Sequence, residues 1–166
     1  MITIKPFEPI FTEALISFIL DIQQNEFNLP IKREDQRDLA NIPVEFQQGN
    51  SNFWIAVDGD QLIGTIALTD LGSGKGALRK MFVHRDYRGA AHGLAKKLLD
   101  TLINWAKEKH FSDLYLGTAE KLHAAHRFYE KNGFELVARN EVPDGKYIMP
   151  VDTKFYHLCV STISNT

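Results

Sequence analysis

Apolar residues recur along this chain with two different periods, and these periods predict where helices and strands lie. Thr12 is suited to cap a helix, because its hydroxyl can accept a hydrogen bond from a backbone N–H of the first turn. The residues after it place apolar side chains at helical spacing: Leu15, Phe18, Ile19 and Ile22. The pattern breaks at Asn28-Leu29-Pro30. A second short helix is predicted from Glu34 to Phe46, with its end left open by Pro43.

Two apolar runs with strand character follow, from Phe53 to Val57 and from Leu62 to Leu68. Asp58-Gly59-Asp60 separates them and is a strong turn signal, so the two runs predict a β-hairpin. Gly64 inside the second run indicates a bulge or a close backbone contact. Gly72-Ser73-Gly74-Lys75-Gly76 is interpreted as a flexible turn, because the segment that follows it, Ala77 to Val83, reads as a strand and not as a helix.

The most regular helical pattern of the chain begins at Leu94. One face of this predicted helix is apolar: Leu94, Ala95, Leu98, Leu99, Leu102, Ile103 and Ala106. The remaining predicted elements are a short strand over Leu114-Tyr115-Leu116, a helix from about Lys121 to Lys131 that Asn132-Gly133 ends, and strands over Phe134 to Val137 and Thr153 to Val160. This order, β-α-α-β-β-β-α-β-α-β-β, predicts an α/β sandwich around a mixed sheet.

Composition and charge narrow the class of protein. The 166 residues are 44% hydrophobic and 24% charged, which is typical of one globular domain. The net charge of −2 shows no basic excess, so nucleic acid is not favoured as a partner. Cys159 is the only cysteine, which excludes an intrachain disulfide, and its place in a predicted strand favours a buried side chain over a nucleophile. No signal peptide and no bilayer-spanning run is recognised, so we expect a cytoplasmic protein without a membrane partner.

The segment between Val83 and Leu94 carries the main functional signal. Small residues at positions 89, 90, 91 and 93 allow a ligand to approach the backbone closely. The helix that follows directs its first N–H groups and the positive end of its dipole to the same place, which suits a phosphate or pyrophosphate. Arg88 adds a permanent cation, and Lys96 and Lys97 lie one turn into the helix, within reach of outer phosphates. A helix start packed against a strand is the alternative interpretation.

Two motifs resemble the GNAT superfamily of acyl-CoA-dependent N-acyltransferases. Leu78 to Gly89 is similar to the fourth strand of the family and its exit, and Ala125 to Phe134 is similar to the family signature Ala-x-x-Phe/Leu-Tyr-Glu-Lys-x-Gly-Phe. The cofactor motif of the family, Arg/Gln-x-x-Gly-x-Gly/Ala, fits in two registers. One starts at Arg88; the other aligns Leu98-Leu99 and makes Gly93-Leu94-Ala95 the core, with a longer loop before it. We favour the second register, which leaves the tight position as glycine.

The resemblance implies the fold, the cofactor and the residues that hold it. The expected fold is one GNAT domain over residues 1–166, with three layers: a mixed, mostly antiparallel sheet of about seven strands, flanked by about four helices and splayed at strands 4 and 5. The implied cofactor is acetyl-CoA, no metal is implied, and a homodimer is compatible with the resemblance. The implied cofactor-binding residues are Met81, Phe82, Val83, Arg88, Gly89, Ala90, Ala91, His92, Gly93, Leu94, Ala95, Lys96, Ala125, Phe128 and Tyr129.

The chemistry that the resemblance implies is direct acetyl transfer to an amine in a ternary complex. A backbone N–H of Phe82 or Val83 would stabilise the oxyanion, and Tyr129 would donate a proton to the leaving thiolate. The alternative for Tyr129 is a packed ring whose hydroxyl bonds to the backbone. No carboxylate stands at the start of the fourth strand, where family members often carry a base. The candidate bases are Asp70, His123 and His126, each of which can also be an ordinary surface residue. A water chain fed by backbone carbonyls, or an acceptor that arrives already neutral, is an equal alternative.

The acceptor is expected to be a primary amine of a small molecule, an amino acid or a peptide. In such folds the loop between the first two helices and the late strands select it, which here means Gln23 to Asn28 and Val142 to Tyr147. The candidate substrate residues are Glu26, which would attract a cationic amine, Phe27 and Asp70. A solvated helix end is the other interpretation of Glu26. A coenzyme-binding sensor with weak catalysis is the alternative function, because the usual carboxylate is missing and the cofactor loop is irregular.

Overall fold

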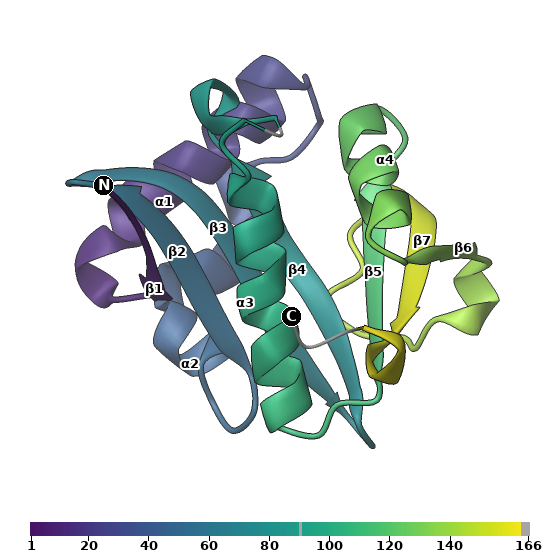
Figure 1. Ribbon diagram of the computed structural model, residues 1–166. Helices are drawn as coiled ribbons and strands as arrows, with labels where there is room; N and C mark the ends of the chain where they lie inside the picture. Colours follow the sequence, from purple (N-terminus) through teal and green to yellow (C-terminus); the bar gives the residue numbers. More distant parts are fainter. Residues whose placement is uncertain (90, 164–166) are drawn as a thin grey trace. The chain divides into compact units, whose positions relative to one another are not determined.

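The computed structural model describes residues 1–89 and 91–163, which group into two compact units (Figure 1). The first unit comprises Met1–Leu68 and Lys80–Leu102, and the second comprises Thr69–Arg79 and Ile103–Thr166. Seven strands hydrogen-bond in the order β1-β2-β3-β4-β5-β7-β6. The pairing of β4 with β5 is parallel, whereas β1–β2, β2–β3, β5–β7 and β6–β7 are antiparallel. The expected α/β class with a mixed, mostly antiparallel sheet is confirmed.

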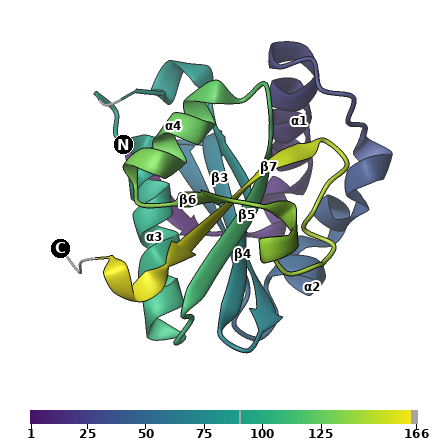
Figure 2. The same ribbon diagram turned by 90° about the vertical axis from the view of Figure 1, so that its right-hand side faces the viewer.

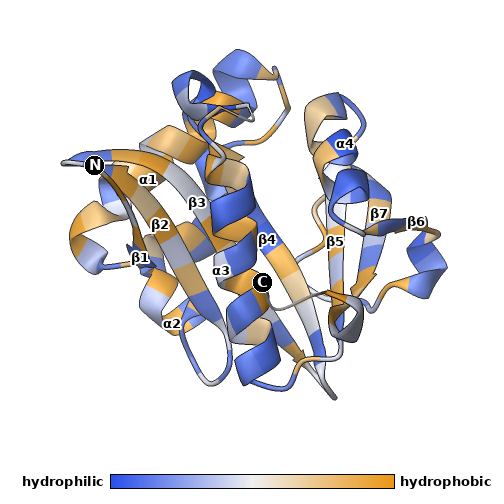
Figure 3. Ribbon diagram, viewed as in Figure 1, coloured by the Kyte–Doolittle hydropathy of each residue, from blue (hydrophilic) through white to orange (hydrophobic). Residues whose placement is uncertain are grey.

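The first unit places helices on both faces of its strands. It contains β1 (Ile2–Pro6), β2 (Asn52–Asp58), most of β3 (Gln61–Gly72) and the end of β4 (Lys75–Val83). Helices α1 (Thr12–Leu20) and α2 (Ile42–Phe46) lie on one face of these strands, and the first part of α3 (Leu94–Glu108) lies on the other, as Figures 1 and 2 show together. In Figure 3, orange bands alternate with blue along α3, which is the pattern of a helix with one buried face.

The alternation of β2 explains this arrangement. Because successive side chains of a strand point to opposite faces, Phe53, Ile55 and Val57 enter one core together. That core also holds residues of α1, α2 and β3, and its buried members are Phe7, Leu15, Ile16, Ile19, Leu39, Ile42, Phe46, Phe53, Ile55, Val57, Leu62 and Ala67. Phe53 is fully buried and meets the rings of Phe7 and Phe46 edge-on. Full burial of side chains of this size contributes about 1.5–3 kcal/mol each.

The β2–β3 hairpin confirms both expectations for Gly64. Ala56 pairs with Gly64 and Val57 pairs with Leu62, so Ile63 is the extra residue of a bulge. A Cβ on Gly64 would lie 3.0 Å from Cδ1 of Leu98 on α3, so glycine is what lets this helix approach the strand. The turn is confirmed as well, with Gly59 at φ +62° between paired Asp58 and Gln61.

The chain before β2 differs from its prediction. Thr12 does not cap α1: it is the first residue of the helix, and its hydroxyl donates to the carbonyl of Pro9 at 2.8 Å. The single helix predicted over Glu34 to Phe46 is two elements, a kinked 3-10 helix over Arg33–Asn41 and α2. Pro43 lies in the first turn of α2 rather than at an end, because proline lacks the N–H that this turn leaves without a helical partner.

The second unit contains β5 (Asp113–Ala119), α4 (His123–Lys131), β6 (Glu135–Val137) and β7 (Asp152–Cys159). The parallel ladder between β4 and β5 pairs Lys75–Ala77 with Asp113–Tyr115. The predicted end of α4 is confirmed, with Gly133 at φ +94°. Cys159 is only half-buried, contrary to the prediction, because its side chain faces the hydroxyl of Ser161 at 3.2 Å. Within the described ranges, no helix combines the length and the hydropathy needed to cross a membrane.

Candidate active site

The loop between β4 and α3 has the backbone form expected of an anion cradle. Gly89 and Gly93 adopt φ of +99° and +61°, which side chains on an L-residue rarely allow. The N–H of Gly93 donates to the carbonyl of Gly89 at 3.2 Å, and the N–H of Lys97 donates to the carbonyl of Gly93 at 3.1 Å. The loop therefore turns directly into α3. Ala90, one of the expected cofactor residues, lies outside the described residues.

The first turn of α3 supplies the N–H groups of this cradle. In any α-helix the N–H groups of the first turn have no acceptor within the helix, which here concerns Leu94, Ala95 and Lys96. Leu94 is buried, so its side chain packs into the protein. The ammonium of Lys96 forms an ion pair with Asp100 one turn further on. These positions can bind a phosphate through the main chain and the positive end of a 15-residue helix.

Three aromatic side chains of the loop pack against one another. The ring of Tyr87 lies 5.6 Å from the ring of His92 and 5.8 Å from that of His84. The hydroxyl of Tyr87 donates to Asp58 at 2.6 Å, and this hydrogen bond lowers the pKa of the Asp58 carboxyl and raises the pKa of Tyr87. The loop is thereby tied to the β2–β3 hairpin. Sequence reasoning did not find this contact, because Tyr87 and Asp58 lie far apart in the chain.

Arg88 makes three hydrogen bonds to the protein itself. Its Nη2 donates to Oε1 of Glu26 at 2.8 Å, and Nη1 donates to the other carboxylate oxygen of Glu26. Its Nε donates to the carbonyl of Val83 at 2.8 Å, and its guanidinium lies 5.7 Å from the ring centre of Phe27. Arg88, which was predicted to bind a phosphate, is thus in contact with Glu26 and Phe27, which were predicted to bind the acceptor. It also contacts Val83, which was predicted to stabilise the oxyanion.

The end of β4 carries the backbone irregularity of the site. Lys80 adopts φ +54° within the strand, just before the predicted oxyanion segment Met81-Phe82-Val83. The hydroxyl of Thr65 donates to the carbonyl of Lys80 at 2.7 Å, and the N–H of His84 donates to the carbonyl of Ile63 at 2.8 Å. Such an interruption of the regular strand is typical of edges that leave the ladder and meet a ligand.

A buried polar chain connects this irregularity to the segment before α2. The ammonium of Lys80, which is 8% exposed, donates to Oε1 of Gln36 at 2.7 Å. Gln36 in turn donates to Oε1 of Gln23 at 2.7 Å, and both amides are buried. Gln36 is the residue with non-helical backbone angles in the 3-10 helix over Arg33–Asn41. Lys80 was not a sequence candidate, because it directly follows another cationic residue, Arg79, within β4.

Tyr129 lies on α4 with its ring enclosed by aromatic neighbours. The rings of Phe128, Phe134 and Tyr156 lie within 5.9 Å of it, and its side chain is 6% exposed. Burial, followed by the nearby charges of Asp152 and Tyr156, raises the pKa of Tyr129 well above its usual value. Over residues 1–89 and 91–163, its hydroxyl makes no hydrogen bond, so the backbone bond of the packing alternative is not observed. Ala125 and Phe128 are half-buried on the same helix.

The other candidate bases have structural partners. His126 is buried and not a surface residue, and its Nε2 lies 2.9 Å from the carbonyl of Ala119. His123 packs its ring against that of His126 and is exposed. The carboxylate of Asp70 accepts the N–H of Gly72 at 2.8 Å, a local turn contact near the end of β3. None of these arrangements identifies the base.

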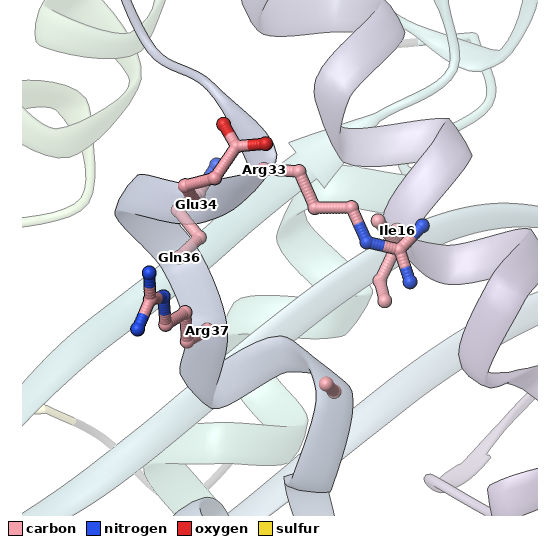
Figure 4. Close-up of a pocket in the computed structure, with 6 residues that line it drawn as sticks. Ile16, Arg33, Glu34, Gln36 and Arg37 are labelled. Carbon is pink, nitrogen blue, oxygen red and sulfur yellow. The ribbon is translucent and has the colours of Figure 1, made fainter.

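An open hollow of about 240 Å³ lies beside the 3-10 helix over Arg33–Asn41. Its lining residues are Ile16, Arg33, Glu34, Gln36, Arg37 and Ala40. Figure 4 shows Arg33 extending toward Ile16 of α1, while Arg37 points away from it. Arg33 is bonded through Nη2 to both carboxylate oxygens of Glu13, at 3.0 and 3.1 Å. None of these residues was a sequence candidate, because their charges resemble those of any solvated helix face.

Comparison with known proteins identifies a family and several relatives that this chain resembles. Residues 16–134 match the model of the family described as the acetyltransferase (GNAT) family. N-acetyltransferase family 8 member 2 of Rattus norvegicus is 29% identical over 105 residues, which cover 60% of this chain and 46% of that protein. The chain therefore spans about half of the length of such curated relatives.

Two solved structures share the fold over nearly the whole chain. The acetyltransferase of the GNAT family from Staphylococcus aureus Mu50 has a TM-score of 0.92 and 39% identity, with 96% of this chain and 99% of that chain covered. The PaiA N-acetyltransferase from Thermoplasma acidophilum, solved in complex with coenzyme A, has a TM-score of 0.75 and 20% identity, with coverage of 96% and 99%. The second likeness concerns the fold alone.

Proposed function

The chain belongs to the acetyltransferase (GNAT) family, and from that premise we propose that it transfers acetyl from acetyl-CoA to a primary amine of a small molecule, an amino acid or a peptide. One observation carries the proposal: the loop after β4 turns at two glycines with positive φ and runs straight into the first turn of α3. This is the arrangement that a diphosphate requires, because its oxygens need converging N–H groups and no intervening side chain.

The residues present fit the coenzyme. Gly89 and Gly93 hold conformations that a Cβ would strain, and the first N–H groups of α3 are available by helix geometry. The residues proposed to hold it are the main chain of Gly89 and of 91–95, together with the side chains of His92 and Lys96. The family resemblance implies Ala125 and Phe128 of α4 as well. When bound, acetyl-CoA supplies an acetyl group activated as a thioester. A coenzyme complex of a fold relative, the Thermoplasma acidophilum protein, supports this choice of ligand.

The chain itself would then do two things for the reaction. A backbone N–H at Phe82 or Val83, beyond the irregular residue Lys80, would donate to the carbonyl oxygen on which negative charge develops. Tyr129 would be protonated at physiological pH, since a phenol has a pKa near 10 and burial raises that of Tyr129 further, and it would donate its proton to the departing sulfur as the carbon–sulfur bond breaks. Its hydroxyl has no competing hydrogen bond within the described part of the chain, which favours this role over packing.

The amine must lose a proton before it attacks, and the structure favours no side chain as the base. An unperturbed amine has a pKa near 10. His126 and Asp70 are held by backbone groups, and Glu26 is neutralised by Arg88. We therefore propose a water-mediated path or an acceptor that arrives neutral. The carboxylate of Glu26, already paired, is a poor site for a cationic amine.

The test is a pair of measurements on the purified protein. Calorimetry with acetyl-CoA up to about 1 mM checks binding, since KM values of enzymes fall at or below this concentration. Release of free thiol across a library of amines checks turnover. Binding with turnover on at least one amine supports the proposal. Binding without turnover on any amine supports the sensor alternative, and no heat at all overturns the assignment of the cofactor.

A further inference from the structure

Arg88 donates hydrogen bonds to other residues of the protein, at the place where the cofactor loop begins. Three of its five N–H groups reach Glu26 and the carbonyl of Val83. The arginine and the carboxylate are 34% and 27% exposed, so the pair is partly shielded from water. A two-pronged pair of this kind is among the stronger polar contacts in proteins, because both partners are charged and planar.

We propose that Arg88 and Glu26 form a positioning pair that fixes Asp21–Phe27 against the end of β4. In this proposal, holding that segment is the main role of Arg88, rather than contact with the diphosphate of the coenzyme. The inference deepens the proposed function and rests on it in one respect: Asp21–Phe27 is taken as the acceptor side of the site, and the end of β4 as the place of the acetyl group.

The segment that Arg88 holds is an unusual piece of helix. Asp21–Glu26 continues α1 as a π-helical turn, in which the N–H of Phe27 donates to the carbonyl of Ile22 at 3.0 Å. Asn28 then adopts φ +51°, so the chain reverses immediately afterwards. Such wide turns are rare and are often found at functional sites, because they are less stable than a regular helix and need support from outside.

The support comes from two directions, and both start on β4. On the inner side, the buried amide of Gln23 is bonded to Gln36, which is bonded to Lys80 of β4. On the outer side, Glu26 and Phe27 contact Arg88, whose Nε binds the last carbonyl of β4 at Val83. The residue that anchors the segment therefore also fixes the peptide after the proposed oxyanion residue. A displacement of Asp21–Phe27 would therefore also displace the peptide after Val83.

Charge gives the reason why Arg88 stays with Glu26. If the guanidinium turned to a diphosphate, the Glu26 carboxylate would lose both hydrogen bonds and remain as an unpaired anion in the same unit as the proposed anion cradle. That exchange removes one charged pair to make another and adds repulsion between anions. The N–H groups of Leu94, Ala95 and Lys96, which have no acceptor within α3, need no such exchange.

The experiment uses four variants of the full chain: Arg88→Met, Arg88→Lys, Glu26→Gln and the double variant Arg88→Met/Glu26→Gln. Hydrogen exchange of the amides of Phe27 and Leu29, without any ligand, reports whether the segment is held, because these N–H groups close the turn on Ile22 and Gln23. Calorimetry gives the Kd for acetyl-CoA, and kinetics give KM for the acceptor separately from kcat. Arg33→Met is the matched control, since Arg33 forms another arginine–glutamate pair in the same unit, with Glu13.

For a positioning pair, exchange at Phe27 and Leu29 accelerates about tenfold in each single variant and no further in the double variant. Arg88→Lys resembles Arg88→Met, because an ammonium cannot make the two-pronged contact and the bond to Val83 together. The Kd for acetyl-CoA changes less than about threefold, acceptor KM rises about fivefold or more, and kcat changes less than KM. Arg33→Met leaves all of these unchanged.

Two results overturn the proposal. One is unchanged exchange at Phe27 and Leu29 in the single variants. The other is a Kd for acetyl-CoA that rises tenfold or more in Arg88→Met, is restored by Arg88→Lys and is tightened by Glu26→Gln, which is the behaviour of a phosphate-binding cation. If the unaltered protein binds no acetyl-CoA, the proposed function fails, while the exchange experiment still decides whether the pair holds the segment.

Discussion

We propose two different kinds of chemistry for the loop between β4 and α3 and for the helix α4. The loop offers main-chain N–H groups, positioned by two glycines and by the start of a long helix. Helix α4 offers one side-chain hydroxyl, that of Tyr129, on a ring enclosed by three other aromatic rings. The first kind depends on backbone conformation, and the second on a single atom.

This difference predicts opposite responses to substitution. A main-chain site tolerates the loss of a side chain. It does not tolerate replacement of a glycine of positive φ by a larger residue, because the backbone then shifts and displaces the neighbouring N–H groups. A side-chain site tolerates small backbone adjustments but loses its chemistry when one oxygen is removed. Binding of the coenzyme should therefore respond to the glycines, and turnover should respond to Tyr129.

The largest expected effect is that of Tyr129→Phe on turnover. The substitution removes the proposed proton donor and keeps the ring, so kcat should fall about 100-fold, within the usual range for a general acid. The Kd for acetyl-CoA should stay within about twofold, because the cradle belongs to the loop. Steady-state kinetics and calorimetry measure the two quantities.

Tyr156→Phe is the matched control for that substitution. Tyr156 is also buried, its ring lies 5.9 Å from that of Tyr129, and burial together with its hydrogen bond to Glu130 raises its pKa to about 12. Losing its hydroxyl should lower the free energy of unfolding by about 1 kcal/mol and leave kcat nearly unchanged. Equal kcat for Tyr129→Phe and the unaltered protein would remove Tyr129 as the acid.

The second effect in size is that of Gly93→Val on coenzyme binding. At φ +61° a β-branched residue is strained, so the turn into α3 should shift and the Kd for acetyl-CoA should rise about tenfold. Gly49→Val is the control, because Gly49 has φ +59°, lies far from the loop in the sequence and has open space around it. Similar losses of stability with a changed Kd only for Gly93→Val would locate the cradle, and an unchanged Kd in both would contradict it.

A smaller effect is expected for His92, which lies between the two glycines of the loop in the sequence. His92→Ala removes a ring that touches Tyr87 but leaves the backbone in place, so the Kd for acetyl-CoA should rise no more than about threefold. Calorimetry with the variant measures this directly. A loss as large as that of Gly93→Val would mean that the side chain and not the main chain binds the phosphate, and the contrast between the two regions would disappear.

The contrast between backbone conformation and side-chain contacts also explains which features the sequence could predict. The β2–β3 hairpin and α3 follow from local signals: an Asp-Gly turn between alternating residues, and an apolar stripe that begins after small residues. The proposed cradle rests on a signal of the same class, since the glycines at 89 and 93 stand in the sequence itself, and both adopt positive φ. Resemblance to a family then supplied the cofactor, which local signals alone left open.

The contacts of Arg88 and Lys80 could not be predicted, because both depend on partners far along the chain. Glu26 lies 62 residues before Arg88, and Gln36 lies 44 residues before Lys80. Nothing in the residues near Glu26 or Gln36 distinguishes them from a solvated helix face. The break in helical geometry at Gln36 also has a nonlocal cause, since a buried amide bonded to Gln23 and Lys80 holds it there. Propensity describes a segment alone, and tertiary contacts override it.

The smallest expected effect concerns the dependence of kcat on pH, and it separates the two regions once more. As the proposed donor, Tyr129 can act only while it is protonated. Because burial raises its pKa above the usual value near 10, it should remain protonated throughout the range from pH 7 to about 10. With both substrates saturating, the ionisation of Tyr129 should therefore not lower kcat below pH 10. Any decline of kcat in that range should also be present in Tyr129→Phe. Ionisation of an amine acceptor acts in the other direction, since more of it is neutral as the pH rises. A decline centred below pH 10 in the unaltered protein, absent from Tyr129→Phe but present in Tyr156→Phe, would mean that the ring of Tyr129 is exposed to water during turnover and that its burial is not what sets its chemistry.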